Sequence, residues 1–334
     1  MEIESIMKVD MKNNLIILMA IVFAVLPSCT KNLEDISDVH TYQISCSTDD
    51  VKACLGEKIG ESNHIGYVWQ EGDVLHVGQI TGVKDVTEAD FVLKSGAGTS
   101  NAIFEYTGEK TFDNTSWKGI IYGAKRIGHD SYFNNGFADN RVWMQYSIPN
   151  TQEYEANNIK PEYAPVYALG VTDLSNTRDG SGNTAFRHIC GIIRIPLHTA
   201  SSYTTVKSIE LTCTKNIAGN FRFQYYEGAI KYMEGADGNV YQSITYNMPN
   251  VKPSAAEGNT VYANIVVNAS YWNPTTTATT EYYTTLDNLA VKVKYTLDDE
   301  KPDAVSTITK SRTNEVALRI TPNMIITIPA IELP

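Results

Sequence analysis

The chain has 334 residues, of which 43% are hydrophobic and 19% charged, and its formal net charge is −11. This composition can fill a core and excludes a disordered chain, and the length fits two domains better than one. The acidic balance argues against nucleic acid as a partner and against charge-driven attachment to anionic membranes, because both need clusters of Lys and Arg.

An apolar run, LIILMAIVFAVLPSC, occupies residues 15–29. It is short for a bilayer span, and Ser28 and Cys29 end it before a polar, acidic stretch. The pattern is typical of a secretory signal that closes on a lipobox, so it predicts a signal peptide over residues 1–28 and lipid on Cys29. A buried hydrophobic helix is the alternative. Because residues 1–10 are net acidic and signal n-regions are basic, we favour Met11 over Met1 as the start.

Four cysteines remain beyond Cys29, namely Cys46, Cys54, Cys190 and Cys213. Export permits disulfides, but the spacing is not that of a small stapled domain and no Cys-x-x-Cys occurs. Buried free thiols in strands are favoured, and the pairing is left open.

Beyond the signal region the sequence predicts an almost entirely β chain. Residues 289–297 alternate apolar and polar side chains with a period of two, as do residues 316–321 and, less cleanly, 261–267. This is typical of strands with one buried and one solvated face, and no long segment has a helical period. Further strands are expected at 42–46, 74–77, 91–93, 102–106, 119–123, 142–148, 166–171, 188–197, 208–212, 221–226 and 325–333.

Polar, glycine-rich turns separate these runs, for example at residues 179–183 and 235–239. Many short strands with frequent turns predict sandwiches or barrels. The polar segment at 175–183 is the expected domain boundary. We therefore predict an N-terminal segment with one strand, an N-terminal β-sandwich and a C-terminal β-sandwich, at residues 29–52, 53–178 and 179–334.

Several motifs resemble those of one family. Residues 69–74 (WQEGDV) resemble the W-x-x-G-D-x-I opening of the Bacteroidales-type fimbrillins, the Mfa-like or type V pilus proteins. Residues 91–104 are similar to that family's glycine turn before a second strand, and residues 148–154 (IPNTQEY) to its P-x-x-Q-x-Y segment. Further counterparts are residues 186–191 (FRHICG) at the start of the second domain, 217–219 (IAG) and 325–333. The order of these motifs, together with a lipobox, is more specific than any one of them.

The resemblance implies two tandem transthyretin-like β-sandwich domains in a lipoprotein that reaches the cell surface. In polymerising members of the family, a trypsin-like protease removes an N-terminal segment that includes the first strand. The vacated groove then accepts a strand of the next subunit, which is a form of β-augmentation. Here the removable strand is the one expected at 42–46.

The chain departs from the family at the cleavage position. No arginine precedes Arg126, so the nearest equivalent is the bond between Lys52 and Ala53. A trypsin-like pocket accepts lysine, but an arginine-specific protease does not. A solvated surface charge explains Lys52 equally well.

The residues do not indicate an enzyme, a cofactor or a metal site. The six histidines form no His-Glu-x-x-His, and no Gly-x-Ser-x-Gly occurs. His188 and Cys190 fall two apart on one expected strand, but no orienting partner is evident and packing explains them better. The acidic residues at 298–303 lack the glycine spacing of a calcium loop and fit a solvated hairpin tip.

The prediction is therefore a fimbrillin-like surface lipoprotein, a pilus subunit or accessory adhesin that assembles by β-strand exchange. Its expected partners are other fimbrial subunits, a receptor or glycan on a host or bacterial surface, and the outer membrane through lipid on Cys29. Once processed, it would lie in the fimbrium. The alternative is a monomeric outer-membrane lipoprotein that binds glycans through exposed aromatics such as Trp117, Trp143 or Trp272, although strand aromatics more often fill cores. A secreted hydrolase is a distant alternative.

Overall fold

The structure is a computed structural model. It describes residues 39–47, 69–80, 86–122, 126–127, 142–156, 158–171, 174, 184–226, 229–253, 260–269, 284–297, 304–312, 318–320 and 324–334. The predicted signal peptide, Cys29 and the Lys52–Ala53 bond lie outside these residues. So do Cys54, residues 175–183, the acidic residues at 298–303, Trp272 and the side chains of Trp117 and Trp143.

The predicted all-β fold is confirmed. Strands account for most of the described chain, and the one helical element with described bounds is the three-residue 3-10 helix η4 (Pro161–Tyr163). No helix in the described ranges is long and apolar enough to cross a membrane. The described residues from His40 onward belong to one compact unit.

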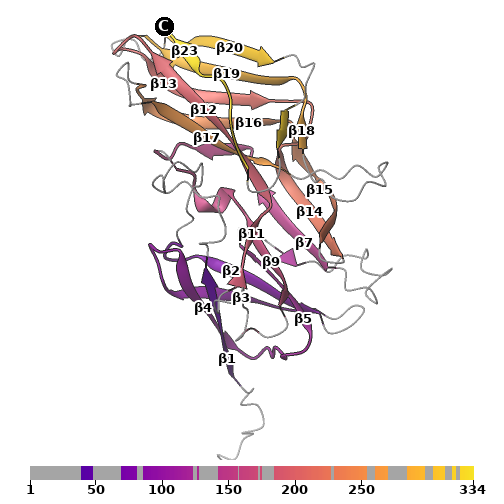
Figure 1. The fold of residues 1–334 in the computed structure, drawn as a ribbon. Coiled ribbons are helices and arrows are strands. Elements are labelled where there is room, and N and C mark those ends of the chain that lie inside the picture. Colours follow the sequence, from indigo (N-terminus) through magenta and orange to yellow (C-terminus); the bar gives the residue numbers. More distant parts are fainter. Residues whose placement is uncertain are drawn as a thin grey trace, which may run out of the picture. The chain divides into compact units, whose positions relative to one another are not determined.

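One sheet has eight strands in the order β10, β1, β4, β3, β2, β5, β9, β11 (Figure 1). Its pairs are antiparallel except for β1 with β10, which run parallel. The bounds are β1 (His40–Ser47), β2 (Val74–Ile80), β3 (Val86–Ser95), β4 (Asn101–Gly108), β5 (Trp117–Tyr122), β9 (Val166–Val171), β10 (Thr184–Ala185) and β11 (Arg187–His188).

The remaining described strands form four further sheets. The first has the order β15 (Ala229–Tyr241), β14 (Ala218–Tyr226), β7 (Val142–Ile148), β6 (Arg126–Ile127). The second is β20 (Ser306–Arg312), β19 (Leu289–Thr296), β13 (Thr205–Thr212), β16 (Ser243–Val251), β8 (Thr151–Glu153). In the third, β12 (Cys190–Thr199) lies between β17 (Val261–Asn268) and the two short strands β22 (Ile325–Thr327) and β23 (Ile331–Leu333). The fourth pairs β18 (Thr284–Leu286) with β21 (Leu318–Ile320).

Hydrogen-bonded ladders link strands on the two sides of residue 179. β7 pairs with β14 (Figure 1). β8 pairs with β16, while β10 and β11 pair with β1 and β9. The boundary at residues 178/179 itself stays a prediction, because residues 175–183 are outside the described ranges.

The core follows the predicted period of two. In β19 the side chains of Leu289, Val291, Val293 and Tyr295 are buried, while Lys294 between them is exposed. These residues belong to one apolar cluster that draws on every described sheet. Alternation of this kind is what places one face of each strand against the core.

Two local predictions were wrong in detail. The turn expected at 235–239 does not separate strands: Gly219 lies opposite Val240 and Phe221 opposite Gly235, so residues 236–239 form a bulge inside β15. The strand expected at 325–333 divides into β22 and β23 around Pro329, which has no N–H to donate to β12.

Candidate strand-exchange site

β1 is paired with a neighbouring strand along its whole length on one side only. β4 pairs with it from His40 opposite Gly108 to Ser47 opposite Asn101. On the other side, β10 pairs with Cys46 and Ser47 alone. β1 is thus almost an edge strand, and one ladder holds most of it in the sheet.

The inward side chains of β1 fill the core. Ile44 and Cys46 are fully buried, and Ile44 lies directly opposite Phe104 of β4. The Tyr42 hydroxyl accepts a hydrogen bond from the backbone N–H of Phe112 at 3.0 Å, and the two rings meet edge to face with centroids 5.3 Å apart. Loss of β1 would therefore expose apolar surface at Phe104 and Phe112 and leave the Phe112 N–H without its acceptor.

The outward side chains of β1 make only exposed polar contacts. Gln43 donates to a Glu105 carboxylate oxygen at 2.6 Å, and Lys94 pairs with the same oxygen. Lys94 first, and Gln43 second, lower the pKa of Glu105. Because solvent screens such contacts, the inward side chains and the ladder hold β1 more strongly than this face does.

Residues 184–188 contact both margins of the eight-stranded sheet. β10 pairs with β1 and β11 with β9, and only Phe186 separates these two short strands in the sequence. The sheet curls far enough for its two outer long strands to be bridged by five consecutive residues. The buried Phe186 ring lies 5.9 Å from that of Trp69, so the bridge is anchored in the same core that β1 covers.

The first family-like motif, residues 69–74, packs into this core. Trp69 is fully buried and lies edge to face against Phe104 at 4.9 Å and Tyr122 at 5.4 Å. Asp73 accepts hydrogen bonds from the Gln70 N–H at 2.7 Å and the Tyr122 hydroxyl at 2.9 Å. Burial raises the pKa of Asp73 even though these hydrogen bonds favour the carboxylate.

The glycine turn of the second family-like motif, residues 91–104, is hydrogen-bonded directly to residues 69–74, the first motif. The Trp69 N–H donates to the Thr99 carbonyl at 3.0 Å, and the Gly98 N–H donates to the Trp69 carbonyl at 2.7 Å. The glycine turn leads straight into β4, the strand that holds β1. Both motifs thus support the core beneath β1 and present no reactive group.

The structure does not assemble a catalytic pair from His188 and Cys190. They lie on different strands, β11 and β12, and both are buried. Burial lowers the pKa of His188 to about 3 and raises the pKa of Cys190 to about 12. At neutral pH the imidazole and the thiol are therefore both uncharged, and no thiolate nucleophile is available. Cys46, Cys190 and Cys213 are buried free thiols.

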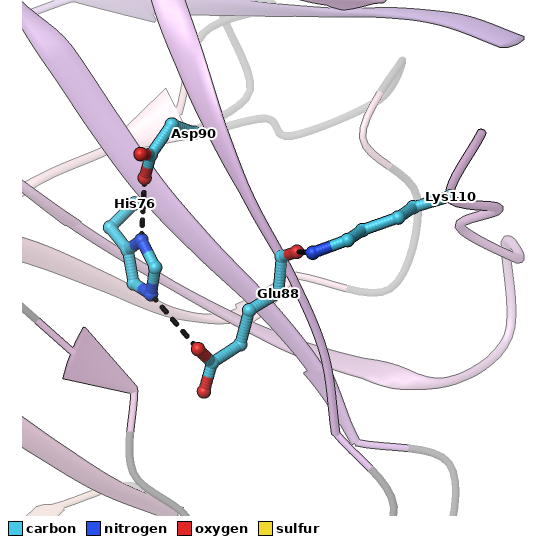
Figure 2. Close-up of polar contacts among 4 residues, drawn as sticks. All are labelled: His76, Glu88, Asp90 and Lys110. Atoms are coloured by element: carbon cyan, nitrogen blue, oxygen red, sulfur yellow. Dashed lines mark hydrogen bonds and ion pairs between the residues drawn. The ribbon is translucent and has the colours of Figure 1, made fainter. Parts of the chain in front are cut away.

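A polar cluster that the sequence analysis missed lies on β2 and β3. Figure 2 shows His76 between two carboxylates, with Nδ1 2.6 Å from an Asp90 oxygen and Nε2 3.5 Å from a Glu88 oxygen. Lys110 donates to the backbone carbonyl of Glu88. The carboxylates lie on opposite sides of the imidazole and do not converge on one point. In the described part of the chain, no three His, Cys, Asp or Glu side chains are grouped to hold a metal ion.

Comparisons with known proteins give structural similarity only. No protein-family model matches the chain, and no curated protein matches its sequence significantly. A proposed cell adhesion protein from Bacteroides fragilis is 9% identical, with 87% of this chain and 89% of that chain covered and a TM-score of 0.43. Another from Parabacteroides distasonis is 10% identical, with 87% and 88% covered and a TM-score of 0.42.

The tip fimbrial protein Mfa3 from Porphyromonas gingivalis, truncated at its C-terminus, is also similar. It is 11% identical, with 84% of each chain covered and a TM-score of 0.35. The group that the sequence motifs resemble is thus represented among these structures. Similarities of this size do not carry a function to the chain.

Proposed function

We propose that the chain is a fimbrillin-like surface protein, a pilus subunit or accessory adhesin, that assembles by exchanging β1 for a strand of another subunit. The observation that carries the proposal is the position of β1: it covers the core with Ile44 and Cys46, yet a single continuous ladder holds it. A strand with these properties is able to leave, and the groove it vacates favours a replacement strand.

The groove specifies the strand that would replace β1. That strand must run antiparallel to β4 and place side chains at three alternate positions. It needs a hydrogen-bond acceptor where the Tyr42 hydroxyl meets the Phe112 N–H, an aliphatic side chain where Ile44 faces Phe104, and a small one at Cys46. Main-chain hydrogen bonds supply affinity, and these three positions supply selectivity.

Export and processing are parts of the same proposal. The signal peptide at 1–28 and lipid on Cys29 would deliver the chain to the outer membrane, and cleavage between Lys52 and Ala53 would release residues 29–52 with β1. Until cleavage, β1 keeps the groove filled and prevents premature association. No catalytic or cofactor chemistry is required for this function.

The exchange is tested with a synthetic β1. The chain from residue 30 receives a specific protease site among residues 48–68, is cut, and is offered a fluorescent peptide of residues 39–48. We expect the cut protein to take up the peptide, and an Ile44→Asp peptide to be rejected. A folded, cut protein that retains its own β1 and takes up no peptide, or one that accepts both peptides equally, contradicts strand exchange.

The N-terminus of the protein found on cells distinguishes the polymerising subunit from the monomeric alternative. An N-terminal sequence and intact mass are measured on protein taken from the cell surface. A mature start at Ala53 supports the polymerising subunit, since β1 has been removed. An acylated Cys29 start means that the groove stays filled, which favours a lipid-anchored protein that binds as a monomer.

A further inference from the structure

Arg194 occupies an unusual place for a cation. It lies on β12 at a half-buried position, and its Nε donates to the side-chain oxygen of Asn264 at 3.0 Å. The guanidinium carbon is 5.3 Å from the centre of the Tyr262 ring, within the range of a cation–π contact. Two contacts therefore fix the plane of the guanidinium.

Asn264, whose side-chain oxygen accepts from Arg194, is itself held in place. Asn264 is 1% exposed and lies directly opposite Arg194 on β17. Its Nδ2 donates to the backbone carbonyl of Asn158 at 3.5 Å, a long hydrogen bond that keeps its oxygen turned toward Arg194. The arginine is thereby oriented from behind by a buried side chain, which lowers the entropy lost when a ligand binds.

No carboxylate balances this charge in the described part of the chain. The residues beside Arg194 on the two neighbouring strands are Asn264 and Thr327, both uncharged. Burial lowers the pKa of Arg194, with only Tyr262 acting in the opposite direction, but an arginine stays protonated at neutral pH. Within the described residues, Arg194 is therefore a half-buried cation without an acidic partner, in a protein whose net charge is −11.

We infer that Arg194 binds the carboxylate of an acidic sugar. With Nε and one face of the guanidinium occupied, the two Nη groups form the remaining fork, which matches a carboxylate in a bidentate geometry. The exposed Thr327 lies opposite Arg194, and Tyr262 holds its ring against the guanidinium; both residues carry uncharged hydroxyls, the kind of group that bonds sugar hydroxyls. This site is independent of β1 and of strand exchange.

An extended acidic peptide fits the same place less well. Both edges of β12 are paired beside Arg194, by β17 and by β22, so a peptide strand cannot add to β12 there. A peptide would have to bind through its carboxylate alone. A pyranose ring with a carboxylate also offers several hydroxyls to neighbouring neutral groups, which is why we assign the sugar.

The test uses immobilised polygalacturonate, its fully methyl-esterified form and poly-glutamate, with binding measured by interferometry. We expect the wild-type chain to bind polygalacturonate and not the ester. Arg194→Gln should weaken binding at least tenfold, and Arg194→Lys should weaken it too, because a point charge lacks the fork. Lys292→Gln removes the same charge from an exposed pair with Glu210 and should bind as the wild type does.

The outcomes separate the possible explanations. Equal binding by wild type and Arg194→Gln, or absence of binding to polygalacturonate, overturns the site. Binding to poly-glutamate as tight as to polygalacturonate overturns the sugar and assigns the arginine to acidic peptides. Circular dichroism checks each variant for folding, and if Arg194→Gln does not fold, Arg194→Lys decides, since it keeps the charge and most of the packing.

Discussion

The side-chain amide of Gln152 hydrogen-bonds to both backbone polar groups of Val266. Its Nε2 donates to the Val266 carbonyl at 2.8 Å, and its Oε1 accepts from the Val266 N–H at 3.0 Å. Gln152 is fully buried on β8, and Val266 lies on β17, whose sheet partner is β12. The amide thus behaves as one residue of an additional strand and ties two sheets together.

We expect Gln152→Ala to lower the free energy of unfolding by about 2–4 kcal/mol, because the buried N–H and carbonyl of Val266 each lose a partner. The measurement is urea denaturation. Thr151→Ala changes an exposed neighbour on the same strand and should cost less than about 0.5 kcal/mol. Equal effects of the two substitutions would show that the amide bonds do not stabilise the fold.

Two glycines of the family-like motifs give a matched pair. Gly72 and Gly96 both have positive φ, 88° and 96°. A Cβ on Gly96 would lie 2.1 Å from the Asn101 carbonyl oxygen, whereas one on Gly72 meets nothing within 4 Å. Both alanine variants incur a backbone penalty of about 1 kcal/mol.

Only Gly96→Ala adds a clash with rigid backbone. We therefore expect it to lower the free energy of unfolding by at least about 2 kcal/mol more than Gly72→Ala does. Thermal and urea unfolding of both variants check the difference. Similar values would mean that the turn relaxes around the new methyl group.

The period of two predicted individual strands well. Residues 142–148 and 166–171 form strands with the predicted ends, and the strand expected at 42–46 extends by two residues before and one after. β16 was not predicted, although Ile244, Tyr246 and Met248 are buried at alternate positions, because Pro249 lies in the run and proline is disfavoured inside strands. β20 has few apolar residues because it is the last strand of its sheet, where polar side chains suffice.

The sequence did not predict which strands pair with one another in the sheets. Alternation says which face of a strand is buried but not which strand lies beside it, so the pairing of β7 with β14 left no local signal. The His76 cluster depends on the same information: His76 lies opposite Asp90 only because of the register between β2 and β3. Arg194 was missed because its neighbours Asn264 and Thr327 come from two distant segments.

The core contribution of β1 is measured at Ile44. Because this side chain is fully buried opposite Phe104, Ile44→Ala should lower the free energy of unfolding by about 2–4 kcal/mol through lost burial and the cavity left behind. Ser45→Ala, on the outward side of the same strand, should change it by less than about 0.5 kcal/mol. Urea denaturation of the uncut chain gives both values, and a small effect at Ile44 would contradict a core-filling role for β1.

The His76 cluster makes stability depend on pH in a defined direction. Burial disfavours the imidazolium, but hydrogen bonds and charge interactions with Glu88 and Asp90 outweigh this and raise the pKa of His76 above its ordinary value of 6.5. The folded chain thus binds this proton more tightly than the unfolded chain does. The resulting stability is fully present below about pH 6.5 and is lost as the pH rises through the folded-state pKa.

The stability difference between wild type and His76→Gln should therefore shrink between about pH 5.5 and pH 8.5, a window in which both carboxylates stay ionised in the unfolded chain. Urea denaturation at several pH values within it provides the measurement. His198→Gln is the control, because its contact with Glu332, at 3.1 Å, joins exposed side chains and contributes little. A His76→Gln difference that stays constant or grows with pH contradicts a stabilising imidazolium between the two carboxylates.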